Sequence, residues 1–350
     1  MTQTITVLPE PFDAHCHLRQ GDMLPTTVWF AAKYFSCAVA MGNTVPAIAT
    51  ADDVARYEAE ILDHVPRGRN FTPTVAMMLT RKTTAKTIRE AGKRGIAVLK
   101  YIPKGVSTNS EESISLEQLP QYFSVMDAAV GADMVFSGHW EAMRDRDGEE
   151  VHELFREQEA IYHLDNVVKL FPSLKIVVEH ASTKAMIDYV KTCPLNVRCT
   201  LTLHHALIEY WHVFGGDGKT IVNPHLFCKP VAKREEDKRA VLEAMLSGDP
   251  RFFFGSDSAP HLKSAKEKTP PPAGIFSAPV AIPKLAEIFF AHGKTANDLA
   301  NFTSRFGLKF YGKTMPQKTI TLARKDWVVP PEYHGLVPFL ARQTLHWQVV

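Results

Sequence analysis

The sequence predicts an α/β protein built as a closed (β/α)8 TIM barrel. Short apolar or β-branched runs alternate with longer amphipathic ones along the 350 residues, a pattern typical of parallel strands connected by helices. Eight strands are expected, at 11–17, 37–43, 71–78, 96–102, 133–139, 175–180, 197–204 and 251–257. Eight such units favour a closed barrel over an open, doubly wound sheet.

Amphipathic segments between these runs predict helices. Segment 50–65 begins with Thr50 and Asp53, which can form a capping box ahead of Val54, Ile61 and Leu62. Similar patterns predict helices at 183–192, 235–246, 279–292 and 295–306. We expect a single barrel domain over 1–350, in which the segment from about residue 313 is a strand-and-loop tail.

Two segments interrupt the alternation. Residues 103–110 directly follow Lys100 and have a loop-like composition, which predicts a mobile lid. Residues 263–273 contain three consecutive prolines, so we expect no regular structure there.

Composition excludes several classes of function. Net charge is +2, with acidic and basic residues interspersed, so neither a nucleic-acid nor a membrane partner is implied. Five cysteines without Cys-x-x-Cys spacing argue against a disulfide framework or a zinc knuckle. The first residues lack the pattern of a signal peptide, and no apolar run reaches 18 residues. We therefore expect a cytoplasmic globular protein.

Chemically reactive side chains gather at the C-terminal ends of the predicted strands, the face of a barrel that carries active sites. They are His15, His17, Asn43, Lys100, His139, His180, His205 and Asp257. His15 and His17 are two residues apart, so a strand directs both imidazoles to one side. Arg19 continues this spacing, and a guanidinium suits a carboxylate.

The residue types predict a pair of metal ions. Four imidazoles and one carboxylate are too many ligands for one tetrahedral zinc. An ammonium at Lys100 would repel metals, but a neutral lysine that reacts with CO₂ gives a carbamate able to bridge two cations. Two ions about 3.5–4 Å apart would acidify a shared water. Asp257 could accept its proton and pass it to a leaving nitrogen, which predicts hydrolysis of an amide or the reverse reaction.

These motifs resemble the amidohydrolase superfamily, and within it the short, bacterial and yeast type of the dihydroorotase family. The resemblance rests on the run Asp13-Ala14-His15-Cys16-His17-Leu18-Arg19, on Lys100, His139 and Glu179-His180, on Pro224-His225-Leu226 and on Gly255-Ser256-Asp257-Ser258-Ala259-Pro260-His261. It extends to 337–340 and so covers nearly the whole chain.

The resemblance implies a ligand set and a substrate site. Two Zn²⁺ per chain would be bridged by carbamylated Lys100, with Asp257 as both ligand and proton shuttle. His15, His17 and Asp257 would complete the first zinc site, and His139 and His180 the second. Arg19, Asn43 and His261 would bind the substrate α-carboxylate. Backbone groups near Leu226 and Ala273 would read the ring amides, and Ser107 and Thr108 would close over the substrate.

The implied reaction is the reversible cyclisation of N-carbamoyl-L-aspartate to L-dihydroorotate in pyrimidine synthesis, carried out by a homodimer. Three departures from the family pattern concern rate and substrate fit. Gly42 stands where proline is usual, which should loosen that turn, and Ser107 replaces a lid threonine. Trp140 replaces a small residue, and its bulk could narrow the pocket or move the second metal.

Two alternatives remain at this point. Another cyclic-amide hydrolase, such as a hydantoinase or allantoinase, would share the metal ligands, but Arg19 and His261 favour an acidic substrate. A catalytically silent barrel acting as a scaffold would be expected to lose ligands, and none is missing. His204-His205 is ambiguous, because either residue could lie at a strand end near the pocket or act as a ligand. The charged run 229–239 is interpreted as a solvated helix start, with Lys233-Arg234 near the mouth of the site as the alternative.

Overall fold

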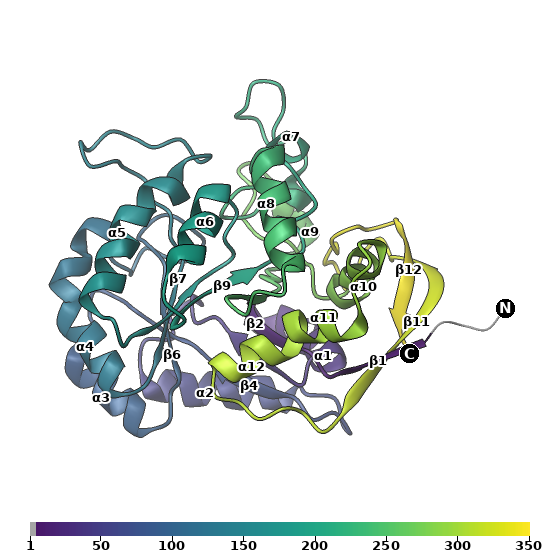
Figure 1. Ribbon diagram of the computed structural model, residues 1–350, viewed down its shortest axis with the longest axis horizontal. Coiled ribbons are helices and arrows are strands. Elements are labelled where there is room, and N and C mark those ends of the chain that lie inside the picture. Colours follow the sequence, from purple (N-terminus) through teal and green to yellow (C-terminus); the bar gives the residue numbers. More distant parts are fainter. Residues whose placement is uncertain (1–4) are drawn as a thin grey trace.

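The computed structural model describes residues 5–350, and its core is a barrel of parallel strands surrounded by helices (Figure 1). The barrel strands are β2 (Phe12–Cys16), β3 (Cys37–Ala40), β4 (Thr72–Val75), β5 (Met77–Met78), β6 (Val98–Tyr101), β7 (Val135–Gly138), β8 (Lys175–Val178), β9 (Val197–Leu201) and β10 (Phe252–Phe254). Each predicted strand run contains at least one of them, so the predicted barrel is confirmed.

The barrel is assembled from two sheets that meet at two seams. One has the order β2-β3-β4 and the other β10-β9-β8-β7-β6-β5. At the first seam the predicted strand 71–78 is split at Ala76, whose N–H donates to Ala40 O at 2.9 Å. At the second seam Asp257 N–H donates to His15 O at 2.8 Å, and His17 N–H donates to Ser258 O at 2.9 Å.

Side-chain alternation along the strands separates an inner from an outer core. Val98, Val135 and Val177 belong to the cluster that fills the barrel, whereas Leu99 and Phe136 pack in the outer cluster with the helices. Because side chains two residues apart share a face, the strand that buries Val98 inside the barrel also directs Lys100 inward. Hydrophobic packing thus fixes the direction of a polar side chain at the top of the barrel.

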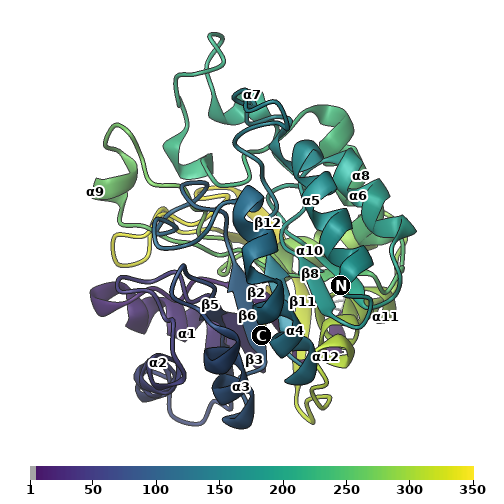
Figure 2. The ribbon, with the colours of Figure 1, turned by 90° about the vertical axis from the view of Figure 1, so that its left-hand side faces the viewer.

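Helices cover the outside of the barrel, as two views at right angles show (Figures 1 and 2). They are α1 (Leu24–Tyr34), α2 (Ala51–Asp63), α3 (Ala85–Lys93), α4 (Phe123–Gly131), α5 (Arg156–Leu170), α6 (Lys184–Thr192), α7 (Tyr210–Val213), α8 (Glu235–Leu246), α9 (Lys263–Lys266), α10 (Ala281–Ala291), α11 (Ala296–Ala300) and α12 (Phe306–Phe310). Short helical turns are η1 (Gly21–Met23), η2 (Leu116–Tyr122), η3 (Pro224–Leu226) and the π-helical η4 (Asn301–Arg305).

The predicted helices are present, but one of them is interrupted, and a short helix forms where no regular structure was expected. Thr50 and Asp53 form the predicted capping box at the start of α2. The predicted helix 295–306 is interrupted by η4. The expectation of no regular structure at 263–273 is wrong for its first four residues, because α9 forms ahead of the prolines.

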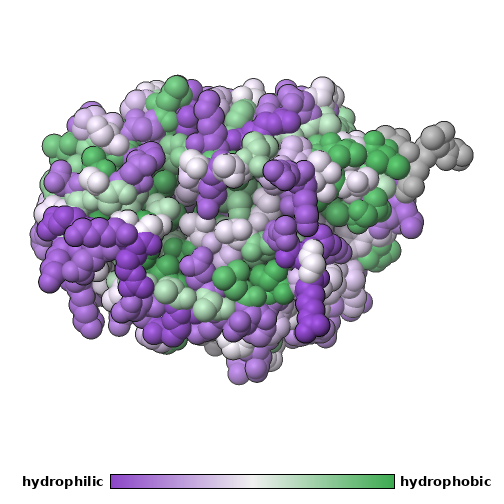
Figure 3. Space-filling model, turned by 90° about the horizontal axis from the view of Figure 1, so that it is seen from below, coloured by the Kyte–Doolittle hydropathy of each residue, from purple (hydrophilic) through white to green (hydrophobic). Residues whose placement is uncertain are grey.

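A small antiparallel sheet lies beside the barrel. It has the order β1-β11-β12, with β1 at Ile5–Pro9, β11 at Thr319–Val328 and β12 at Thr344–Val349. The predicted tail thus pairs with the N-terminal strand, which the sequence analysis did not predict. At the end of the molecule next to the grey N-terminal residues, hydrophobic surface is visible (Figure 3), and β1 exposes Ile5 and Val7. No helix within residues 5–350 is long and apolar enough to cross a membrane.

Candidate metal centre

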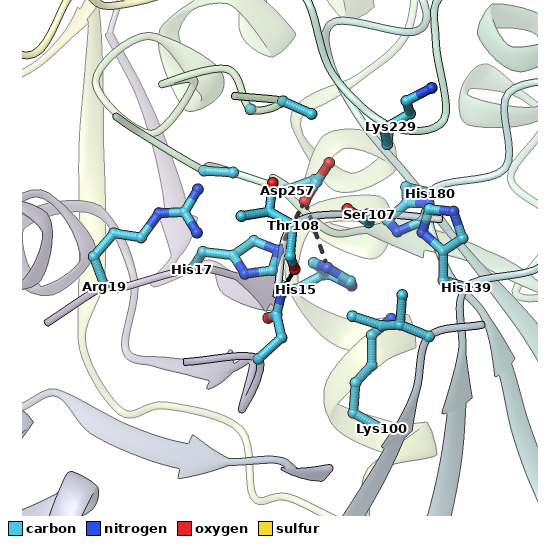
Figure 4. A pocket seen from close by; sticks show the side chains of 15 residues that line it. His15, His17, Arg19, Lys100, Ser107, Thr108, His139, His180, Lys229 and Asp257 are labelled. Carbon is cyan, nitrogen blue, oxygen red and sulfur yellow. Dashed lines mark hydrogen bonds and ion pairs between the residues drawn. The ribbon is translucent and has the colours of Figure 1, made fainter. Parts of the chain in front are cut away.

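A pocket of about 390 Å³ opens at the C-terminal ends of the barrel strands and collects most of the predicted site residues (Figure 4). Its lining consists of His15, His17, Arg19, Asn43, Lys100, Ile102, Ser107, Thr108, His139, His180, Lys229, Asp257, Ala259, Ala273 and Gly274. Among the predicted residues, only Leu226 and His261 are missing from this lining.

His15, His17 and Asp257 form a compact group at the second seam. Asp257 Oδ1 lies 3.5 Å from His15 Nε2 and 3.3 Å from His17 Nε2. One ligand atom from each residue lies within 4.8 Å of the others, as a shared cation requires. Burial lowers the pKa of both histidines, which keeps the imidazoles neutral and able to bind a metal.

A buried carboxylate orients His15. Glu179 Oε2 lies 2.7 Å from His15 Nδ1, so the other ring nitrogen, Nε2, faces the pocket, where it has no hydrogen-bond partner among the described residues. Ser137 and Thr200 also donate to Glu179, at 2.5 and 2.6 Å. Burial alone would raise the pKa of Glu179, but His15 and these hydrogen bonds lower it, so the carboxylate stays ionised. Metal-binding histidines are commonly held in this way.

Removing the charge of Glu179 should weaken metal binding. In Glu179→Gln the amide can accept a hydrogen bond but no longer favours the same imidazole tautomer, so we expect the affinity for the first metal to fall about 10- to 100-fold. Competition with a chelator, followed by metal analysis, measures this change. Glu60→Gln on the exposed face of α2 is the control, and equal metal retention in both variants would contradict the orienting role.

Lys100 reaches the pocket from β6 and is 1% exposed. Its Nζ has no hydrogen-bond partner among residues 5–350. Burial lowers the pKa of Lys100 to about 8, against the opposing effect of Glu179 and Asp257. A fraction of the amine is therefore neutral near pH 7, the form that reacts with CO₂. A buried amine without a partner among the described residues, close to four imidazoles and two carboxylates, fits the predicted carbamate.

His139 and His180 form the other side of the group (Figure 4). Their ring centroids are 4.7 Å apart, and that of His180 is 4.9 Å from that of His15. Glu141 Oε2 lies 2.7 Å from His139 Nε2, which leaves Nδ1 of His139 for the pocket. His180 Nδ1 is buried without a partner among the described residues. Both pKa values are lowered by burial, so these imidazoles are neutral as well.

Lys233 lies behind this side of the site and corrects the interpretation of 229–239 as a solvated helix start. Its side chain is fully buried, with Nζ 3.9 Å from Glu141 Oε1 and donating to Glu153 O at 2.5 Å. Burial would raise the pKa of Glu141, but the His139 hydrogen bond and the Lys233 ammonium lower it to about 2. Glu141 thus remains an anion that can orient His139.

Arg19 and Asn43 lie opposite the histidine pair. The strand ends at Cys16, and Arg19 has a φ of 64°, so strand alternation does not explain its direction. The left-handed backbone and the hydrogen bond from Arg19 Nε to Pro260 O, at 2.8 Å, hold the guanidinium at the pocket. Asn43 Nδ2 donates to Thr108 O at 3.0 Å, which connects this side to the predicted lid.

His261 borders Arg19 from outside the main pocket. Its Nε2 lies 3.0 Å from Arg19 Nη2 and 2.9 Å from Ala273 O. Burial and the Arg19 charge lower the pKa of His261 to about 3, so the imidazole is neutral and can offer a carboxylate a hydrogen bond but no positive charge. Arg19 carries the positive charge of this region, because its own pKa, lowered by burial, is still about 10.

The departures from the family pattern have different effects in the structure. Trp140 does not line the pocket; it packs edge-to-face against Tyr101 and Phe136. A Cβ at Gly42 would lie 2.2 Å from Ala76 O, so this turn is closely packed rather than loosened. Ser107 and Thr108 both line the pocket, as predicted.

The His204-His205 pair lies next to Asp257. His204 is buried, its Nε2 is 4.0 Å from Asp257 Oδ2, and neither ring nitrogen has a hydrogen-bond partner among residues 5–350. His205 is hydrogen-bonded at both nitrogens, to Thr202 Oγ1 and to Pro230 O. The sequence analysis missed Lys229, which lines the pocket, because a lysine in a charged run gives no sign of its direction.

Comparisons with known proteins agree with the geometry of the site. No protein-family model matches the chain. The dihydroorotase of Coxiella burnetii (strain RSA 331 / Henzerling II) is 36% identical, over 98% of this chain and 97% of the relative. The dihydroorotase structure from Campylobacter jejuni has a TM-score of 0.88 and 33% identity, covering 100% of this chain and 98% of its own. That from Saccharomyces cerevisiae, in complex with 5-fluoroorotic acid, has a TM-score of 0.91 and 30% identity, covering 100% and 99%.

More distant structures share the fold alone. The L-hydantoinase of Arthrobacter aurescens has a TM-score of 0.79 at 15% identity and covers 98% of this chain and 83% of its own. The inactive dihydroorotase-like domain of a multifunctional protein from Chaetomium thermophilum has a TM-score of 0.64 at 16% identity, covering 99% and 92%. Both alternatives from the sequence therefore have relatives with this fold, but neither matches the chain as the dihydroorotases do.

Proposed function

The chain belongs to the dihydroorotase family, and from this premise we propose that it cyclises N-carbamoyl-L-aspartate reversibly to L-dihydroorotate at a pair of zinc ions. The observation that carries the proposal is the buried amine of Lys100, which faces His15, His17, His139, His180 and Asp257 without a hydrogen-bond partner among residues 5–350. A carbamate on Lys100 would give this group the bridging anion that two cations need.

The donor set fits two metal ions. His15, His17, carbamylated Lys100 and Asp257 would hold the first, and the carbamate, His139 and His180 would hold the second. Bound there, the pair would polarise the reacting carbonyl and acidify a water molecule. Glu179 and Glu141 would keep His15 and His139 in the tautomers that metal binding requires.

Asp257 would move the proton in both directions. Burial raises the pKa of Asp257, against the opposing effect of His15, which makes the carboxylate a better proton acceptor. In ring opening it takes a proton from the attacking water and gives it to the ring nitrogen that leaves. In cyclisation the same carboxyl group removes the proton from the ureido nitrogen and delivers it to the departing water.

The opposite side of the pocket would bind the carboxylate that does not react. Arg19 offers a planar pair of donors, and Asn43 and His261 lie beside it. Ser107 and Thr108 lie on the predicted lid segment. The hydrogen bond from Asn43 Nδ2 to Thr108 O connects this segment to the Arg19 side of the pocket. Substrate binding and lid position would therefore be coupled through Asn43.

Arg19→Met should raise KM for dihydroorotate strongly and leave metal content unchanged. The variant removes the guanidinium that would pair with the substrate carboxylate. Loss of a hydrogen bond to a charged group costs about 1.5–3 kcal/mol of binding free energy, while the metal ligands remain in place. Steady-state kinetics and metal analysis of the same preparation measure both effects. Arg56→Met on the exposed face of α2 is the control. Loss of metal in Arg19→Met would mean instead that the arginine supports the ligand group.

A substrate comparison tests the proposed function directly. The full chain, purified without chelator, should contain about two zinc ions and open dihydroorotate in preference to hydantoin and allantoin. Activity on the neutral rings alone would favour the hydantoinase alternative. A chain without bound metal and without activity would favour the scaffold alternative.

Several further properties remain predictions. The homodimer follows from the family resemblance and can be measured by analytical ultracentrifugation. We also propose that the chain forms one barrel domain, which the pairing of β1 with β11 in the tail supports. A cytoplasmic location stays a prediction from the sequence.

A further inference from the structure

Lys266 is a buried lysine that the proposed mechanism does not use. It lies at the end of α9 and is 2% exposed. Within residues 5–350 it has no ion-pair partner, and its Nζ instead donates to three backbone carbonyls, Phe227 O at 3.0 Å, Pro272 O at 2.9 Å and Gly274 O at 2.9 Å. A buried ammonium without a carboxylate is costly, so the two hydrogen bonds to residues 272–274 and the third to Phe227 O call for an explanation.

The segment that Lys266 binds forms part of the pocket wall. Ala273 and Gly274 line the pocket. The carbonyls of residues 272 to 274 all turn toward donor side chains, since Ala273 O lies 2.9 Å from His261 Nε2 and Lys266 binds the other two. Gly274 N–H donates to Phe227 O at 2.9 Å, which joins this segment to the strand-like stretch after η3.

The geometry of the peptide bond then gives the direction of one backbone donor. In a trans peptide the C=O and the N–H point in opposite directions, and the Pro272–Ala273 bond is not among the cis bonds. Because Pro272 O is bound to Lys266, Ala273 N–H points away from Lys266. Among the described residues, no acceptor is hydrogen-bonded to Ala273 N–H, although Ala273 lines the pocket.

We propose that Lys266 is a positioning residue that directs the Ala273 N–H toward the substrate ring by holding the carbonyls on the other side of the same segment. The inference rests on the proposed function, because the group that accepts this hydrogen bond would belong to the ring or its ureido precursor. The ammonium also leaves one positive charge without a carboxylate partner close to Arg19, which favours a dianionic substrate.

Gly274 gives this segment its close fit. Its φ is 147°, and a Cβ there would lie 2.1 Å from Ala259 O. The segment is therefore packed closely against the chain that follows Asp257, and Lys266 binds two of its carbonyls. Loss of the ammonium would leave Pro272 O and Gly274 O without these donors and allow the peptide to rotate.

Binding of 5-fluoroorotic acid to the zinc-loaded full chain tests the inference without turnover. We expect Lys266→Met to raise the Kd at least tenfold and KM for dihydroorotate in parallel, with kcat changed less than threefold and two zinc ions retained. Lys263→Met is the matched control, because Lys263 lies on the same helix and is exposed, 3.8 Å from Glu332; it should bind as the unmodified chain does.

A second measurement keeps the inference testable if Lys266→Met does not fold. Burial lowers the pKa of Lys266 to about 8, so an unmodified chain should bind 5-fluoroorotic acid more weakly at pH 9 than at pH 7, as the ammonium is lost. The groups that face Lys266 titrate elsewhere: burial raises the pKa of Cys228, that of Arg19 is about 10 and that of His261 about 3. Lys100 is removed from this range by carbamylation.

The outcomes separate the two proposals. Normal binding by Lys266→Met, or a Kd that does not change between pH 7 and pH 9, overturns the positioning role and leaves the proposed function intact. A drop in kcat with loss of zinc, at unchanged Kd, also overturns it, because Lys266 would then support the ligands. An unmodified chain that neither binds 5-fluoroorotic acid nor opens dihydroorotate overturns the proposed function and this inference together.

Discussion

We expect Lys100→Ala to abolish ring opening and to leave the chain unable to retain two metal ions. Two groups of ligands face each other in the pocket, one made of His15, His17 and Asp257 and the other of His139 and His180. Among the pocket residues, Lys100 is the side chain proposed to supply the bridging anion between them, and the alanine removes it. Without that anion, two cations a few ångströms apart repel each other across a pocket lined by neutral imidazoles. Metal analysis and the dihydroorotate assay on one preparation measure both losses.

Chemical rescue distinguishes a lost bridge from a damaged fold. Small carboxylic acids such as acetate or propionate fit the space that the lysine side chain leaves, and they should restore part of the activity when zinc is present. The same acids should give no gain in the unmodified chain. Lys184→Ala, which changes an exposed lysine of α6, is the control for the substitution. Full activity of Lys100→Ala without added acid would remove the bridging role.

Asp257→Asn should lower kcat about 10²- to 10⁴-fold, the range that general acid–base catalysis contributes. The amide keeps an oxygen that can bind metal and keeps the size of the side chain, but it cannot accept and return a proton. Because Arg19 and Asn43 are the residues proposed to bind the opposite end of the substrate, KM should change much less than kcat. Steady-state kinetics and metal analysis separate the proton transfer from ligand binding.

Asp249→Asn is the matched control for this substitution. Asp249 precedes β10 at the other end of the strand and pairs with Arg251 at 2.9 Å, so its replacement should leave kcat unchanged. If Asp257→Asn kept its kcat while losing zinc, Asp257 would be a ligand only, and the proton would have to move through another group.

Much of the fold could be predicted because local patterns determine it. The run Ile96-Ala97-Val98-Leu99 reads as a buried strand, and its alternation places Lys100 with Val98 on the inner face. The β1-β11-β12 sheet was only partly predicted. The pairing of β1 with β11 joins residues more than 300 positions apart. The hydrophobic pattern of either strand does not indicate such a distant partner.

The predicted metal ligands came from strand ends, whereas the lysines that were not predicted to lie at the site are found elsewhere. Lys229, Lys233 and Lys266 occur in charged or proline-rich stretches, where the usual expectation for lysine is exposure. Their burial depends on tertiary partners such as Glu153 O and the carbonyls around Gly274. Leu226 was predicted from the resemblance to offer backbone groups, but it is not among the residues that line the pocket.

The seam between β2 and β10 has a consequence for the order in which the centre can form. His139 and His180 follow adjacent strands near the middle of the chain, whereas Asp257 N–H is hydrogen-bonded to His15 O across the closure of the barrel. During translation, His15 and His17 are therefore synthesised early, long before Asp257, the carboxylate with which they form the first metal site. A nascent polypeptide could gather the second group first, but only the last barrel strand brings the two halves of the centre together.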